Sequence, residues 1–140
     1  MKMNDDEFRQ AMATLEAYKV QLDAMAQQSN FFKLSLEETL RARDTLNAFA
    51  NAKEGDEILV PAGASSFVIA TVTSKRKAVV GIGNKVSIDM DLEQAAKYMA
   101  DSAEEVQDAI KKLTETINEM TAKARELSIA VQQEYQRRQQ

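Results

Sequence analysis

The sequence predicts a mainly α-helical fold with a small β region, in which two long helices pair as an antiparallel coiled-coil hairpin joined by two β-hairpins. Three observations predict it. Apolar residues recur at alternating steps of three and four near both ends of the 140-residue chain. All four glycines and the only proline lie between these stretches, among short β-branched runs. Aromatic residues make up only 6% of the chain, which favours apolar stripes over a thick globular core.

The first helix is expected over about residues 5–52. Thirteen positions follow the three-four spacing, and ten of them are apolar: Phe8, Ala11, Leu15, Tyr18, Leu22, Met25, Ser29, Phe32, Leu36, Thr39, Arg43, Leu46 and Ala50. The polar members are Ser29, Thr39 and Arg43. This repeat is typical of a helix whose seam faces a partner helix.

The second helix is expected over about residues 91–136, and its stripe has no polar member: Leu92, Ala96, Met99, Ala103, Val106, Ile110, Leu113, Ile117, Met120, Ala124, Leu127 and Val131. Asp91 and Gln94 are spaced as a capping box at its start. Its polar end, QQEYQRRQQ, is expected to fray. Each stripe covers about 40 residues, which is about 60 Å of helix, and equal lengths favour an antiparallel pair. Two unrelated helices in a bundle are the alternative.

The middle segment, residues 56–90, contains strand material in four runs, EILVP, SSFVIATVT, KAVVGIG and KVSID. Turn residues separate them at Ala62–Ser65, Ser74–Lys77 and Gly83–Asn84. Two small hairpins bury little apolar surface, and free strand edges pair readily. We therefore expect the sheet to be completed by other subunits, the alternative being hairpins covered by the helices alone.

Composition narrows the function classes. The net charge of −4 argues against nucleic-acid and membrane-surface partners. The chain has neither Cys nor His, which excludes thiolate and imidazole catalysis, and no nucleotide or metal motif is present. We expect no catalytic residue, no metal site and no cofactor, so the protein is not expected to be an enzyme. Without a signal-like or membrane-spanning stretch, it is expected in the cytoplasm.

Two segments resemble the alpha-class prefoldin subunits of archaea. In EILVPAGASSFVIATV, the residues Leu59, Val60, Pro61, Gly63 and Phe67 match that family's LVP-x-G-x-x-x-F pattern. The stretch VVGIGNKVSIDMDLEQA, from Val79 to Ala95, is similar to the V-G-x-G segment that leads into the second helix. The resemblance spans essentially the whole chain.

The resemblance implies an ATP-independent holding chaperone. Two alpha and four beta prefoldin subunits would form a hexamer whose hairpins join into a β-barrel platform. Six coiled coils would hang from it, hold non-native client proteins between their tips and pass them to a group II chaperonin. A structural coiled-coil tether without chaperone activity is the main alternative, and an RNA-gripping helical arm is disfavoured by the acidic charge.

Two sets of residues are candidates for these contacts. Near the open end of the coil, apolar side chains are candidates for client contact, their alternative role being seam packing: Phe8, Met12, Leu15, Leu127, Val131 and Tyr135. In the hairpins, apolar side chains are candidates for the subunit interface, their alternative role being sheet core: Ile58, Val60, Phe67, Ile69, Val79, Val80, Ile82, Val86 and Ile88. A single tip would bind weakly, so several arms on one platform would be needed for avidity.

Overall fold

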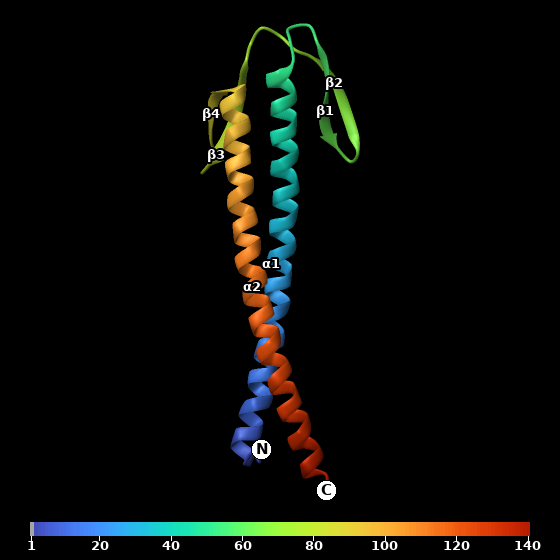
Figure 1. The fold of residues 1–140 in the computed structure, drawn as a ribbon, viewed down its shortest axis with the longest axis vertical. Coiled ribbons are helices and arrows are strands. Elements are labelled where there is room, and N and C mark those ends of the chain that lie inside the picture. Colours follow the sequence, from blue (N-terminus) through green and yellow to red (C-terminus); the bar gives the residue numbers. More distant parts are fainter. Residues whose placement is uncertain (1) are drawn as a thin grey trace. The chain divides into compact units, whose positions relative to one another are not determined.

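A computed structural model describes residues 2–140. The elements follow in the order α1 (Asp5–Asn51), β1 (Glu57–Gly63), β2 (Ser66–Thr71), β3 (Lys77–Gly83), β4 (Val86–Asp91) and α2 (Leu92–Arg138), as Figure 1 shows. The predicted arrangement of two long helices joined by two antiparallel β-hairpins is confirmed. Every member of the two predicted apolar stripes is buried or half-buried, including the polar Ser29, Thr39 and Arg43.

The chain divides into two compact units, each described by itself below. The terminal unit consists of Met1–Lys33 and Asp108–Gln140, and the hairpin unit consists of Leu34–Gln107. In the terminal unit, Asp5 contacts Arg138, and residues 3–18 line one groove together with residues 123–130. The two helices therefore run antiparallel there.

The start of α1 is fixed by a reciprocal pair of hydrogen bonds. The Glu7 amide donates to Asn4 Oδ1 at 2.8 Å, and the Asn4 amide donates to Glu7 Oε1 at 3.3 Å. This is a capping box, and it satisfies two amides that have no partner within the helix.

The start of α2 differs from the capping box predicted for Asp91 and Gln94. Asp91 is the last residue of β4 and pairs in register with Lys77, whose Nζ lies 2.9 Å from Asp91 Oδ1. The Leu92 amide donates to the carbonyl of Arg76 at 3.3 Å. The strand pairing of Asp91 thus directs its carboxylate across the sheet and away from the first turn of the helix.

In the hairpin unit, β1 pairs with β2 and β3 pairs with β4, each pair forming a separate two-stranded antiparallel sheet. Both hairpins turn at two residues with positive φ, Ala64–Ser65 and Asn84–Lys85, with φ between 49° and 62°. This matches a type I′ turn, whose twist suits paired strands. Gly63 and Gly83 precede the turns at φ of 92° and 111°, where the register shifts by one residue. Glycine is favoured at such angles because it has no Cβ.

The core of the hairpin unit joins the second hairpin to both helices. Val80, Met90 and Ala95 are buried at 2%, 6% and 0% exposure. Half-buried side chains pack against them: Leu46, Ala78, Tyr98 and Met99. Because strand side chains alternate between faces, the neighbouring Val79 points away and is 74% exposed. The second hairpin is therefore held to the helices by one face only.

Arg76 anchors the connection between the hairpins to the end of α1. Its Nη2 donates to the Ala50 carbonyl at 2.6 Å and its Nη1 to the Ala52 carbonyl at 3.0 Å. The last turn of α1 contains no basic residue of its own. The guanidinium thus satisfies carbonyls that have no helical partner and complements the negative end of the helix dipole.

We expect Arg76→Ala to lower the free energy of unfolding by about 2 kcal/mol, because two charge-assisted hydrogen bonds are lost. Urea unfolding followed by circular dichroism measures the change. Lys75→Ala is the matched control, because Lys75 donates its hydrogen bond to Thr73 Oγ1 from the backbone amide, which the substitution keeps. Equal stability of the Arg76 and Lys75 variants would show that the guanidinium contributes nothing to the anchoring.

Candidate functional site

The six residues predicted for client contact all lie in the terminal unit, but they differ in exposure. Met12 and Tyr135 are 49% and 55% exposed. The other four are half-buried stripe residues, namely Phe8, Leu15, Leu127 and Val131. Only Met12 and Tyr135 therefore present about half of their surface to solvent in the single chain.

A buried carboxylate lies at the position that continues the α2 stripe beyond Val131. Glu134 is 1% exposed, and both of its oxygens accept hydrogen bonds. Oε2 accepts from Arg137 Nε at 2.9 Å and from the Met3 amide at 3.4 Å. Oε1 accepts from Arg137 Nη2 and from Arg138 Nε, the latter at 3.0 Å. A charge that is paired and hydrogen-bonded in this way can be buried at the end of a coiled coil.

Arg138 joins this carboxylate to the first turn of α1. Its Nη1 lies 2.6 Å from Asp5 Oδ1, and its Nη2 donates to the Met3 carbonyl at 3.1 Å. The guanidinium carbon is 4.5 Å from the centroid of the Phe8 ring, which is a cation–π geometry. We call Met3, Asp5, Phe8, Glu134, Arg137 and Arg138 the terminal clasp.

The clasp corrects the expectation that the polar end of the second helix frays. α2 continues to Arg138, and its last turn is tied to the first turn of α1. The hydrogen bond from Arg137 is the main cause that lowers the pKa of Glu134 to about 2, against the opposing effect of burial. The hydrogen bond from Arg138 also lowers the pKa of Asp5. Both carboxylates are therefore charged at neutral pH, and the clasp is closed.

A groove of about 620 Å³ runs along the terminal unit between the two helices. On one side it is lined by Met3, which precedes α1, and by the α1 residues Glu7, Gln10, Ala11, Thr14 and Tyr18. On the other side it is lined by the α2 residues Lys123, Glu126, Leu127 and Ala130. Leu127 is the one residue of the predicted client set that the groove contains. The small side chains of Ala11 and Ala130 leave space that larger residues would fill.

Sequence reasoning missed three exposed apolar side chains of the terminal unit. Val20, Phe31 and Ile129 are 64%, 68% and 51% exposed. Each stands two residues after a stripe residue and hence on the opposite face of its helix, since two residues turn a helix by about 200°. A search of the sequence for apolar residues at that offset would have found them.

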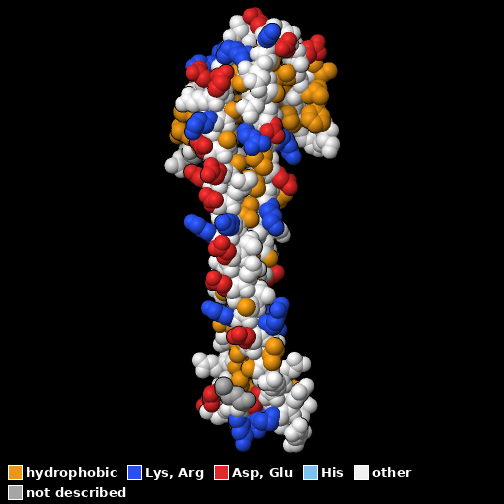
Figure 2. All heavy atoms as spheres, in the orientation of Figure 1, with side chains coloured by type: hydrophobic (Ala, Val, Ile, Leu, Met, Phe, Trp, Pro, Cys, Tyr) orange, Lys and Arg blue, Asp and Glu red, His pale blue; other side chains and the backbone are white. Residues whose placement is uncertain are grey.

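The nine residues predicted for the subunit interface fall into three groups. Val80 is buried within the chain, and Ile58 and Val60 are half-buried. The other six are between 39% and 74% exposed: Phe67, Ile69, Val79, Ile82, Val86 and Ile88. Figure 2 shows apolar side chains at the surface on both sides of the hairpin unit.

The first hairpin carries its exposed apolar residues as cross-strand pairs. Leu59 faces Ile69 and Pro61 faces Phe67 in the register, so all four side chains share one face of the sheet. Leu59, Ile69 and Phe67 are 61%, 66% and 58% exposed, and Leu59 was not among the predicted residues. Alternation along β1 from the half-buried Ile58 and Val60 could have identified it.

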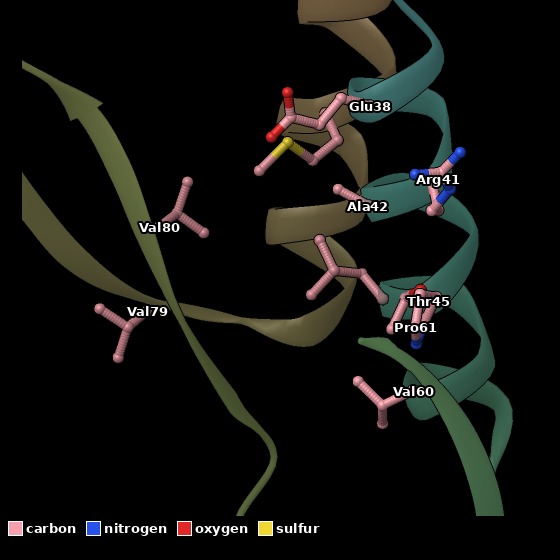
Figure 3. A pocket seen from close by; sticks show the side chains of 10 residues that line it. Glu38, Arg41, Ala42, Thr45, Val60, Pro61, Val79 and Val80 are labelled. Carbon is pink, nitrogen blue, oxygen red and sulfur yellow. The ribbon is translucent and has the colours of Figure 1, made fainter. Parts of the chain in front are cut away.

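An apolar hollow of about 360 Å³ lies within the hairpin unit. Figure 3 shows Val60 and Pro61 of the first hairpin, Val79 and Val80 of the second, and α1 residues around it. Leu46 and Met99 of the two helices also line it. The hollow is therefore bounded by one strand from each two-stranded sheet and by both helices.

Within residues 2–140, no group of acidic side chains is arranged to hold a metal ion. None of the described helices combines the length and the apolar character that crossing a membrane requires.

The chain is similar to known proteins over most of its length. The family described as prefoldin subunit matches residues 18–137. The chain is 28% identical over 135 residues to the prefoldin subunit alpha of Pyrococcus horikoshii, covering 91% of both chains. It is 26% identical to the prefoldin subunit alpha of Methanocorpusculum labreanum, covering 94% of this chain and 89% of the relative.

Two solved structures share the fold. A cryo-EM structure of filamentous PFD from Methanocaldococcus jannaschii superposes with a TM-score of 0.64 at 24% identity, over 87% of this chain and 98% of the other. The crystal structure of the prefoldin beta subunit from Thermococcus strain KS-1 superposes with a TM-score of 0.59 at 16% identity, over 95% of this chain and 96% of the other. With two long helices, two β-hairpins and a family match over most of the sequence, the chain belongs to the prefoldin family of chaperones.

Proposed function

We propose that this chain is the alpha-class subunit of an ATP-independent holding chaperone in the cytoplasm. It would assemble with prefoldin beta subunits into a hexamer of two alpha and four beta chains, bind non-native client proteins through its terminal unit, and pass them to a group II chaperonin. The similarity to proteins named prefoldin subunit alpha supports the subunit class. No catalytic step and no cofactor are part of the proposal.

The hairpins support assembly. Each sheet has only two strands, and a two-stranded sheet is marginally stable by itself. Leu59, Phe67 and Ile69 form an exposed apolar face on the first hairpin, and Val79 is exposed on the second. Strands from neighbouring subunits would cover these faces and pair with the free edges, which joins the hairpins into a shared β-barrel. Val80 would support this platform from inside, because it is already buried in the chain.

The terminal unit supports client holding. Met12 and Tyr135 offer exposed apolar surface, and the same unit contains the half-buried seam residues Phe8, Leu15, Leu127 and Val131. Methionine adapts to many partner shapes at low cost, which suits a surface for varied sequences. Binding to one unit would be weak, but several units on one platform gain about 10²–10⁴ in avidity. Separate weak contacts also exchange without nucleotide hydrolysis.

One observation carries the proposal: large apolar side chains are left in solvent in both units of a prefoldin-family chain, on the hairpins and next to the chain ends. Exposed apolar surface of this kind marks interaction sites.

Suppression of aggregation tests the function. The chain, assembled with a prefoldin beta subunit, should prevent light scattering by a denatured client at near-stoichiometric amounts and without ATP. Addition of a group II chaperonin should then remove labelled client from the complex. A tether would leave client aggregation unchanged.

Two variants test whether the exposed apolar side chains of the terminal unit bind clients. Met12→Ser with Tyr135→Ser should reduce client protection by about half or more, because the most exposed apolar side chains of the predicted set are removed. Leu34→Ser is the matched control, since Leu34 is also exposed, at 66%, but lies in the hairpin unit. Equal loss in both variants would mean that Met12 and Tyr135 have no special role.

A further inference from the structure

The groove of the terminal unit has an apolar floor that remains open while the chain ends are tied together. Ala11, Tyr18, Leu127 and Ala130 line it, and all four are half-buried. Its volume of about 620 Å³ lies in the range of sites that accept small ligands or a few side chains. The terminal clasp closes the seam beyond it, so a client cannot enter between the last helical turns without breaking ion pairs. The groove is therefore an apolar recess that a client can reach without unpairing the helices.

The polar rim of this groove has an excess of negative charge. Glu7 and Glu126 stand against a single cation, Lys123. Within residues 2–140, none of these three side chains takes part in an ion pair. Glu7 accepts only the 3.3 Å hydrogen bond from the Asn4 amide, which leaves its second oxygen available. A cation on an incoming segment would meet two carboxylates whose charge is not yet neutralised.

We propose that this groove is a client subsite that selects extended segments in which an apolar side chain stands beside Lys or Arg. The apolar side chain would lie over Ala11 and Ala130, and the cation would reach Glu7 or Glu126 at the rim. The inference rests on the proposed function, because it assumes that the terminal unit holds clients.

A second copy of the same tip fits the groove less well than such a client. The two arginines of the last turn of α2, Arg137 and Arg138, are committed to Glu134 and Asp5 in the clasp. The terminal unit carries ten acidic and ten basic residues, so a second tip offers no net attraction to an acidic rim. Charge complementarity therefore favours a foreign basic-apolar segment.

The test compares two fluorescent peptides with the same Leu-Phe core, one flanked by Lys and the other by Glu, on the full chain assembled with a prefoldin beta subunit. We expect the basic peptide to bind about three- to ten-fold tighter at low salt, because two partly exposed charge pairs form, and the preference to shrink at high salt. Photo-crosslinking from the Phe of the basic peptide should label Tyr18 or Leu127.

Substitutions in the groove test whether its acidic rim causes the preference for the basic peptide. The double variant Glu7→Gln with Glu126→Gln should remove the preference for the basic peptide, and Gln at position 7 still permits the capping box. Ala130→Leu should weaken both peptides, because it fills the floor. Glu119→Gln, an exposed carboxylate of α2 outside the groove, is the control and should leave the preference unchanged.

The outcomes separate the two proposals. If the assembled chain suppresses client aggregation but shows no preference for the basic peptide, or keeps its preference in the Glu7 and Glu126 variant, the groove inference is wrong and the holding function stands. Failure of the basic peptide to bind also overturns the groove inference. If the chain does not suppress aggregation at all, the proposed function itself fails.

Discussion

Replacing Ile69 with Asp should abolish assembly with prefoldin beta subunits while leaving the helical content of the chain unchanged. Ile69 is 66% exposed and pairs with Leu59 on the open face of the first hairpin, so the single chain does not depend on it for burial. In a shared sheet the same position would be covered, and an unpaired carboxylate buried there costs about 3 kcal/mol or more. Association should therefore weaken by about 100-fold or more. Native mass spectrometry of the mixed subunits measures the loss.

Val20→Asp is the matched control for this experiment. Val20 is 64% exposed, nearly the same as Ile69, but it lies on α1 in the terminal unit. The substitution introduces the same charge into an equally exposed apolar position away from the hairpins. Full assembly of the Ile69 variant, or an equal loss in both variants, would contradict a hairpin-borne interface.

Local pattern predicted the elements of this fold. The three-four spacing marked both helices, and each stripe residue from Phe8 to Ala50 and from Leu92 to Val131 is at least half-buried. The two hairpins were marked by β-branched runs between glycines, and their turns lie at Ala64–Ser65 and Asn84–Lys85. These features depend on residues close together in the sequence, whose periodicity is visible without a structure.

Contacts between distant residues could not be read in the same way. The clasp joins Asp5 to Arg138, 133 residues apart, and buries a charged Glu134 in a polar tail that was expected to fray. Asp91 similarly had the spacing of a helix cap, but its pairing with Lys77 is set by strand register. In both cases a partner from another element determined what the carboxylate does.

Which hairpin side chains are buried also could not be predicted from the sequence alone. Val79 and Val80 are adjacent and chemically identical, so both were predicted at a subunit interface. The pleat directs Val80 into the core with Met90 and Ala95 and leaves Val79 in solvent. Alternation predicts that the two point in opposite directions, but which of them meets the helix depends on how the hairpin is docked.

The pH dependence of the clasp should be visible as a difference between the natural chain and Glu134→Gln. The pKa of Glu134 is lowered from 4.5 to about 2 in the folded chain, mainly by the hydrogen bond from Arg137. A lowered pKa stabilises the folded state above the unfolded value, and this contribution is lost as the pH falls from about 4.5 through 2. We expect Glu134→Gln to lower the thermal midpoint by about 2–5 °C at pH 6–7, with the difference shrinking towards zero near pH 2. Comparison with the natural chain cancels the titration of the other carboxylates, and Glu119→Gln, at an exposed carboxylate of α2, is the control substitution. A Glu134→Gln difference that stays constant from pH 7 to pH 2 would mean that shape and packing, and not the charge on Glu134, hold the chain ends together.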